Sequence, residues 1–159
     1  MMQISFPGGL AVEAAYRGHT IRTDQPRGAG GDDSSPSPFE LFLAAIGTCA
    51  GYYALRFCQA RGLPTEGLGL TLETERGEGR DHLSAVRLEI LPPPAFPAKY
   101  RAAIVRAAEQ CKVKAHIAEP PRFEIVATEG RSAPLASVSG LPGLPPRGGP
   151  PAAAGGALW

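Results

Sequence analysis

The sequence predicts an α+β domain, and three features of the chain support that fold class. Short apolar runs separated by turn residues occupy the first 24 positions, a pattern typical of strands joined by hairpins. A long apolar segment with few charges follows, and this segment predicts a helix. Two later runs alternate apolar and polar residues, as half-buried strands do.

The amino-terminal runs predict three strands. They span Gln3–Phe6, Leu10–Tyr16 and His19–Thr23. Arg17 and Gly18 separate the last two runs, which is the spacing of a two-residue hairpin. Residues 24–37 contain Ala29 as their only aliphatic residue, so they predict a long loop.

The central helix is predicted over Phe39–Gly62, with a signal at each end. Ser37 can cap the exposed backbone N–H groups, Pro38 suits the first turn, and Glu40 completes a capping box. Gly62 then provides the stop. Because the helix is apolar nearly all round, we expect a sheet or a second subunit to bury it.

After this helix, the pattern predicts a hairpin, a second helix and a last strand. The apolar positions of the hairpin are Leu68, Leu70, Leu72, Val86, Leu88 and Ile90, with the connection around Gly77–Asp81. An apolar stripe at helical spacing predicts the second helix over Ala98–Gln110. Alternation of Phe123, Ile125 and Ala127 predicts the last strand.

Composition limits the partners and the compartment. The chain has 159 residues with 16 basic and 15 acidic side chains, a net charge of +1, which predicts neither nucleic-acid binding nor attraction to a membrane. It shows no signal peptide and no uncharged apolar run of membrane-spanning length, so we expect a cytoplasmic protein. Residues 130–159 hold 7 Gly and 6 Pro, which predicts a disordered tail after a domain of residues 1–129.

Of the three cysteines, Cys49 and Cys111 are the candidates for chemistry. Cys49 lies between Gly47 and Gly51, which cost helix stability and let a substrate or backbone approach. Cys111 precedes the cationic run Lys112–Lys114, and a cationic segment of this kind can lower the pKa of a thiol. All three cysteines also fit an inert place in the core, and Cys58, roughly opposite Cys49 on the helix, fits it best.

The run Pro38–Cys49 (PFELFLAAIGTC) resembles the central-helix motif of the OsmC/Ohr family, the osmotically inducible and organic hydroperoxide resistance proteins. A second match surrounds Cys111, in the run AAEQCKV, and the loop at 23–31 resembles a less characterised branch of that family. The resemblance extends over about residues 3–129 and leaves the tail outside.

This resemblance implies a fold of antiparallel sheets around a long buried central helix, in an intertwined homodimer. It also implies a cysteine peroxidase for organic hydroperoxides or hydrogen peroxide, with Cys49 peroxidatic and Cys111 resolving. A dithiol reductant, a lipoyl-protein or a thioredoxin-like protein, would restore the thiols. No cofactor is implied.

The chain departs from the family pattern at two catalytic positions. The peroxidases have a glutamate directly after the motif proline, where this chain has Phe39; Glu40 is the nearest substitute. They also use an arginine from the amino-terminal strands, for which Arg22 and then Arg17 are the substitutes here. These departures leave open an alternative, a non-catalytic binding protein of the same fold for a small apolar ligand, or a thiol carrier.

Two further expectations concern ligands. We expect the hydroperoxide to enter an apolar pocket around the helix, lined by Phe42, Ile46, Tyr52 and Tyr53. We expect no metal site, because the three histidines show no ligand spacing with one another or with the cysteines.

Overall fold

The structure is a computed structural model that describes residues 1–77 and 82–127. Two antiparallel sheets and three α-helices make up this part of the chain, which confirms the mixed α+β fold class. The predicted tail and the connection at 78–81 lie outside the described residues.

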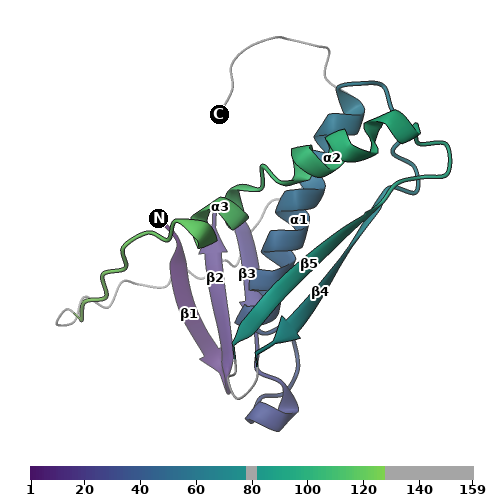
Figure 1. Ribbon diagram of the computed structural model, residues 1–159. Coiled ribbons are helices and arrows are strands. Elements are labelled where there is room, and N and C mark those ends of the chain that lie inside the picture. The colour runs from purple at the N-terminus through teal and green to yellow at the C-terminus, as the bar shows by residue number, and fades with distance from the viewer. Residues whose placement is uncertain (78–81, 128–159) are drawn as a thin grey trace. The chain divides into compact units, whose positions relative to one another are not determined.

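The first sheet is three-stranded, in the order β1–β2–β3 (Figure 1). Its strands are β1 (Gln3–Gly8), β2 (Ala11–Tyr16) and β3 (His19–Thr23). Arg17 and Gly18 both have positive φ, 51° and 79°, as a type I′ turn requires, so the predicted hairpin is confirmed.

The loop after β3 is ordered around the carboxylate of Asp24. That carboxylate accepts hydrogen bonds from the backbone N–H of Gln25 (2.8 Å) and from the N–H and hydroxyl of Ser34 (3.1 and 2.7 Å). The Ser34 bonds hold the pKa of Asp24 below its usual range. Gly31 is required in this loop, since a Cβ there would collide with the carbonyl of Gln25.

Helix α1 runs from Pro38 to Gln59. The predicted capping box is present: the backbone N–H of Glu40 donates to the Ser37 hydroxyl, and the N–H of Ser37 donates to the Glu40 carboxylate. At the other end Gly62 takes a φ of 60°, and the N–H of Leu63 reaches back to the carbonyl of Cys58. This closing turn is a Schellman motif, for which glycine is the favoured residue.

The second sheet is the hairpin of β4 (Gly69–Arg76) and β5 (Leu83–Leu91), as predicted. After it come the 3₁₀ turn η2 (Ala98–Tyr100) and helix α2 (Arg101–Ala108), which lies along α1 (Figure 1). The core forms where these helices meet, from Ala54, Phe57, Cys58, Phe96 and Ile104.

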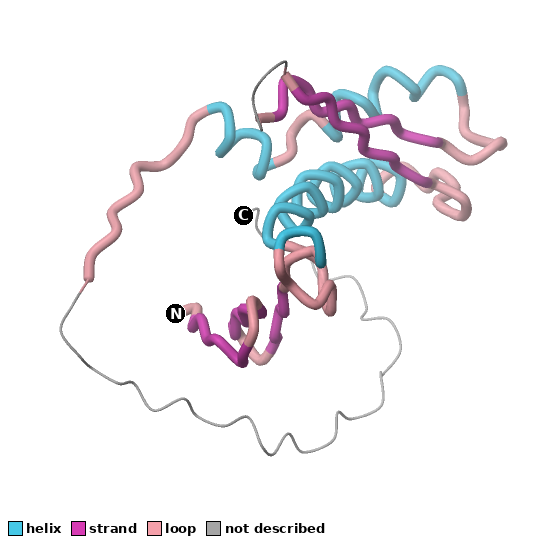
Figure 2. Tube along the Cα trace, turned by 90° about the horizontal axis from the view of Figure 1, so that it is seen from below, coloured by secondary structure: helices cyan, strands magenta, loops and turns pink. Residues whose placement is uncertain are grey.

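Two features after α2 differ from the expectation. A third helix, α3 (Lys112–Ala118), occupies a segment that the periodicity did not distinguish. The strand predicted over Phe123–Ala127 is wrong for the isolated chain, because the segment is extended and without secondary structure (Figure 2). Its apolar side chains remain in solvent: Phe123 is 80% exposed and Ile125 is 95% exposed.

Burial of α1 is also incomplete. Five of its residues are buried: Ile46, Ala50, Ala54, Phe57 and Cys58. Phe42, Tyr52 and Leu55 of the same helix are exposed, so the described part of a single chain does not provide the all-round burial that the apolar sequence predicts.

By length and composition, α1 is also capable of crossing a membrane, with a mean hydropathy of 1.4 over its most apolar window. The core helix of a soluble protein passes the same test. In the structure 28% of that window is buried, and α1 is capped at both ends and packs against α2, α3 and β4.

Candidate thiol site

The candidate site forms where the middle of α1 meets the start of α3. Cys49 lies half-buried on α1, and Cys111 is buried at the residue that precedes α3. The Cys111 sulfur lies 3.9 Å from the carbonyl oxygen of Ile46 and is within hydrogen-bonding reach of the Cys49 thiol. The structure therefore brings together the two cysteines that the sequence singled out, both as free thiols.

Competing effects act on Cys49. Burial raises the pKa of its thiol, but hydrogen bonds to the sulfur oppose that effect. They come from the backbone N–H groups of Val113 and Lys112 and from the Cys111 side chain, and the positive charge of Lys112 adds to them. The net pKa of Cys49 is lowered, which favours the thiolate, the nucleophilic form of cysteine.

Cys111 behaves in the opposite way. Burial raises the pKa of its thiol, and the neighbouring Cys49 raises it further, although the backbone N–H of Lys114 donates to the sulfur at 3.4 Å. The cationic run thus does not lower the pKa of the Cys111 thiol itself. The run instead acts on Cys49, because α3 turns its first N–H groups toward that sulfur.

Little in the sequence predicts this arrangement. Cys49 lies in the middle of an unbroken helix, where its own helix offers no free N–H group. The N–H groups come from Lys112 and Val113, at the start of a short helix that was not expected. The one available signal was the lysine directly after Cys111.

Cys58 lies in the hydrophobic core with no exposed surface, and burial alone raises the pKa of its thiol. These are the properties of an inert core cysteine, which the sequence favoured for this position.

Two of the three substitute catalytic residues, Arg22 and Glu40, have other partners. Arg22 lies 3.7 Å from the Glu13 carboxylate across the β2–β3 pair, and its side chain is 51% exposed. Arg17 is in the hairpin turn. Glu40 is held by the capping box with Ser37, which keeps the pKa of its carboxyl low. None of the three is among the groups that act most strongly on Cys49.

The predicted pocket residues lie on the Cys49 side of α1, within roughly 60° of Cys49 at about 100° per residue. Ile46 is buried and Tyr53 is half-buried, whereas Phe42 and Tyr52 are 39% and 56% exposed. In the single chain this side of α1 is therefore largely open to solvent.

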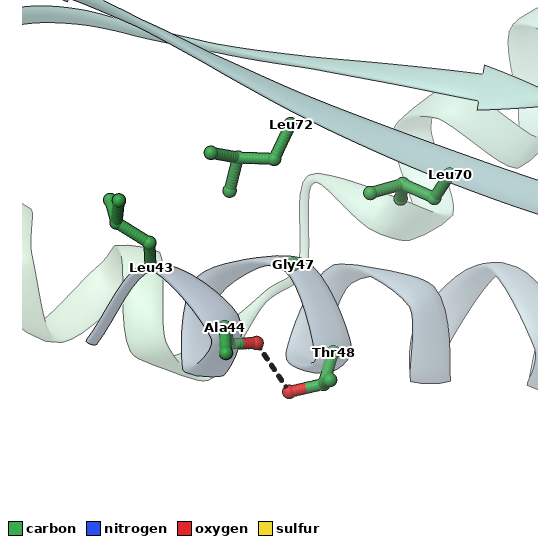
Figure 3. Close-up of a pocket in the computed structure, with 6 residues that line it drawn as sticks. All are labelled: Leu43, Ala44, Gly47, Thr48, Leu70 and Leu72. Carbon is green, nitrogen blue, oxygen red and sulfur yellow. Dashed lines mark hydrogen bonds between the residues drawn. The ribbon is translucent and has the colours of Figure 1, made fainter. Parts of the chain in front are cut away.

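A groove of about 350 Å³ lies on another side of α1 (Figure 3). Its walls are Leu43, Ala44, Gly47 and Thr48 of α1 with Leu70 and Leu72 of β4. Gly47 is turned from Cys49 by about 160° at 100° per residue, so this groove does not open onto the thiol. The Thr48 hydroxyl donates its hydrogen to the Ala44 carbonyl at 2.7 Å, so it can offer the groove only an acceptor.

Within residues 1–77 and 82–127, no three side chains of the metal-binding types gather as a possible metal site.

Comparison with known proteins agrees with the fold and the motif. The family model of OsmC-like proteins matches residues 31–126. A structure described as an osmotic stress induced and detoxification response protein, from Psychrobacter arcticus 273-4, has 18% sequence identity and a TM-score of 0.62, covering 70% of this chain and 83% of that one. Another, from structural genomics, has 21% identity and a TM-score of 0.64, covering 76% and 90%.

An organic hydroperoxide resistance protein OsmC from Legionella pneumophila has 17% identity and a TM-score of 0.50, covering 74% of this chain and 87% of that one. No curated protein sequence matches significantly. At these identities the structural likeness shows the fold alone, whereas the family model covers more than half of the chain. The resemblance seen in the central-helix motif is thus confirmed, and the chain belongs to the family of OsmC-like proteins.

Proposed function

We propose that this protein is a thiol-dependent peroxidase that reduces organic hydroperoxides or hydrogen peroxide with Cys49 and Cys111. The observation that carries the proposal is the contact between two unlike thiols: a half-buried one with a lowered pKa and a buried one with a raised pKa. A peroxidase of this type needs one ionised sulfur to attack and a second sulfur within reach to form a disulfide.

In the first step, the Cys49 thiolate attacks the terminal oxygen of the hydroperoxide. A sulfur–oxygen bond forms and the O–O bond breaks, so Cys49 becomes a sulfenic acid. The leaving oxygen takes up a proton and departs as an alcohol, or as water when the substrate is hydrogen peroxide. Two electrons have then passed from the sulfur to the peroxide.

In the second step, Cys111 attacks the Cys49 sulfur. A disulfide forms, the Cys111 proton is lost, and the sulfenic oxygen leaves as water. The arrangement suits this order, because the Cys49 charge contributes to the raised pKa of Cys111. Once the first step has removed that charge, Cys111 ionises more readily.

A dithiol reductant, a lipoyl-protein or a thioredoxin-like protein, then exchanges with the disulfide and restores both thiols. The cytoplasm keeps thiols reduced, and we propose that the protein acts there. We also propose a homodimer. Phe42 and Tyr52 lie exposed beside Cys49, and a second subunit covering them would enclose the substrate pocket.

The second candidate function is a non-catalytic binding protein of the same fold. The apolar groove between α1 and β4 favours it, since about 350 Å³ is enough room for a small apolar ligand. The positions of Arg22 and Glu40, each paired elsewhere, also favour it.

Peroxide treatment separates the two functions. Trypsin would release each cysteine on its own peptide, with Cys49 on residues 28–56, Cys58 on 57–61 and Cys111 on 107–112. After one equivalent of cumene hydroperoxide, we expect a loss of two hydrogens and a cross-link between the first and third peptides. Unchanged thiols, or over-oxidation confined to Cys49, would favour the binding protein.

Turnover with a dithiol gives the second test. We expect Cys49→Ser to abolish peroxide consumption, because serine provides no thiolate. Cys58→Ala is the matched control and should keep most of the activity, since Cys58 lies in the core. A Cys49→Ser variant that consumes peroxide at the parental rate would refute the proposal.

A further inference from the structure

A cavity separate from the thiol site lies beside the start of α1. It has a volume of about 430 Å³, which is larger than the groove between α1 and β4. Its walls come from the loop after β3, the first residues of α1 and the end of the β4–β5 hairpin. The lining residues are Gln25, Pro26, Ala29, Ser37, Phe39, Arg76, His82 and Leu83. Neither Cys49 nor Cys111 is among them.

Hydrogen bonds hold the loop side of this cavity in place. The Ala29 N–H donates to the Pro26 carbonyl at 2.8 Å, and the Asp33 N–H donates to the Gln25 carbonyl at 3.1 Å. Gly31 lies so close to the Gln25 carbonyl that a Cβ would collide with it. These contacts fix the backbone of the loop, so this wall is formed before a ligand binds, as is usual for small-molecule sites.

Strand pairing holds the hairpin side. Arg76 pairs with Leu83 at the end of the β4–β5 ladder, and the Gly77 N–H donates to the His82 carbonyl at 3.0 Å. The two basic residues of the wall, Arg76 and His82, are therefore attached to a hydrogen-bonded backbone.

The side chains of the wall that can carry a charge are all basic. They are Arg76 and His82, and no Asp or Glu is among the eight lining residues. Arginine stays protonated at neutral pH and presents a planar fork of N–H donors that matches a carboxylate. Asp24 and Glu40 are neighbours of lining residues in sequence, but each carboxylate accepts hydrogen bonds within its own loop or helix cap. The wall therefore favours an anionic ligand.

Phe39 supplies an aromatic part of the wall. Its side chain is 48% exposed, and its ring stacks on that of Phe42 with the centroids 5.7 Å apart. The family pattern has a glutamate at this position, so phenylalanine puts an apolar ring where a negative charge would lie. With Pro26 and Leu83, Phe39 gives the cavity an apolar side that suits a planar ring.

From this combination of basic and aromatic walls, we infer that the cavity binds an aromatic carboxylate. The ring of the ligand lies against Phe39, and its carboxylate pairs with Arg76. His82 and Gln25 provide further hydrogen-bonding groups. A volume of about 430 Å³ accommodates an acid of one or two rings. The inference does not depend on the proposed peroxidase function.

The test is isothermal titration calorimetry of the full-length protein with 2-naphthoate at pH 7. We expect binding to one site with a Kd of about 0.1 mM. The neutral alcohol 2-naphthalenemethanol has the same ring system without the charge, and it should bind at least about tenfold more weakly. Equal affinities for the acid and the alcohol would overturn the inference. Tighter binding of 2-naphthyl phosphate than of 2-naphthoate would overturn the assignment to a carboxylate.

Two variants test the walls. Arg76→Gln removes the charge, so the Kd for 2-naphthoate should rise by about tenfold or more. Phe39→Leu keeps an apolar side chain without the ring, so the Kd should rise by about threefold to tenfold. Arg87→Gln is the matched control, because Arg87 lies on β5 of the same hairpin and does not line the cavity. Its Kd should stay within about twofold of the parental value.

The inference is overturned if Arg76→Gln keeps the parental affinity, or if the two arginine variants lose affinity equally. If Arg76→Gln fails to fold, the comparison of acid and alcohol on the parent and the Phe39→Leu variant still decide it. Cys49→Ser should bind 2-naphthoate like the parent, because no thiol lines the cavity. A parent without peroxidase activity would refute the proposed function alone, and a parent that does not bind 2-naphthoate would refute this inference alone.

Discussion

Cys49 and Cys111 differ in what surrounds each sulfur. The Cys49 sulfur accepts hydrogen bonds from two backbone N–H groups and from Cys111, which stabilise its negative charge. The Cys111 sulfur is more deeply buried, and the adjacent Cys49 opposes its ionisation. In the pair, Cys111 is therefore the hydrogen-bond donor and Cys49 the acceptor.

This difference predicts how substitutions of Cys111 act on Cys49. Cys111→Ala removes a donor from the thiolate, so the pKa of Cys49 should rise and its alkylation rate at pH 7 should fall by roughly threefold to tenfold. Cys111→Ser keeps an O–H donor and should stay within about twofold of the parent. The measurement is the alkylation pH profile on peptide 28–56. Equal profiles for the two variants would show that no such hydrogen bond matters.

At the residue scale, the sequence identified both thiols but not the source of their difference. Cys49 stood out through its flanking glycines and its family motif, and Cys111 through the second motif. Lys112 was visible as a cation, yet its target depends on how α3 packs on α1. Spacing along the chain does not determine that contact.

At the scale of elements, the start of α1 depends on the Ser37–Glu40 capping box. Ser37→Ala removes an acceptor for the first turn and should lower the free energy of unfolding by about 1 kcal/mol. Chemical denaturation at pH 7 measures this loss, with Ser35→Ala as the control, because Ser35 lies outside the cap and its hydroxyl donates only to the carbonyl of the neighbouring Ser34. An unchanged midpoint for Ser37→Ala would contradict the role of the box.

The capping box also predicts a pH dependence. The hydrogen bonds with Ser37 hold the pKa of Glu40 in the folded protein below its value in the unfolded chain. The bond to the Glu40 carboxylate therefore stabilises the fold at pH values above the unfolded pKa, which is about 4.3. This contribution is lost as the pH falls through the folded pKa. The stability difference between the parent and Glu40→Gln should therefore be larger at pH 7 than at pH 3. A difference that grows in acid would reverse the sign and refute the assignment.

Helix α3 should respond to oxidation of the thiols. The residues of α3 are not buried. The first turn of α3 depends on two contacts with sulfur: the N–H of Lys114 donates to Cys111, and the N–H groups of Lys112 and Val113 contact Cys49. A disulfide removes the charge that these groups bind. We therefore expect faster amide hydrogen exchange over 112–118 in the oxidised protein than in the reduced one. Equal or slower exchange on oxidation would contradict this coupling.

The elements with local signals were predictable from the sequence, and the others were not. Capping residues marked α1, and the Arg17–Gly18 turn marked the first hairpin. The seven residues of α3 are too few for apolar periodicity to identify a helix. Phe123–Ala127 has the alternation of a strand, but strands form by pairing, and no described strand pairs with it.

At the scale of the whole molecule, no element of the described residues 1–77 and 82–127 covers several exposed apolar side chains. They include Phe42 and Tyr52 of α1 as well as Ile4 and Phe6 of the first sheet, with Phe6 79% exposed. Soluble proteins rarely leave large apolar side chains gathered in solvent unless another surface covers them. A second copy of the chain is the occupant that we propose, because it would bury the exposed side of α1 next to Cys49.

The dimer can be tested by changing one exposed residue on that side. Light scattering after size exclusion should give twice the chain mass of 16.6 kDa for the parent. Tyr52→Glu, which places a charge at the proposed interface, should shift the protein to the monomer and slow peroxide turnover, because the pocket loses its second wall. Val105→Glu is the control. Val105 is an apolar residue with a similar exposed fraction, 49% against 56% for Tyr52, but it lies on α2. The dimer should therefore persist in this variant. A monomeric parent at tens of micromolar, or equal dissociation by both variants, would show that the exposed side of α1 is not the interface.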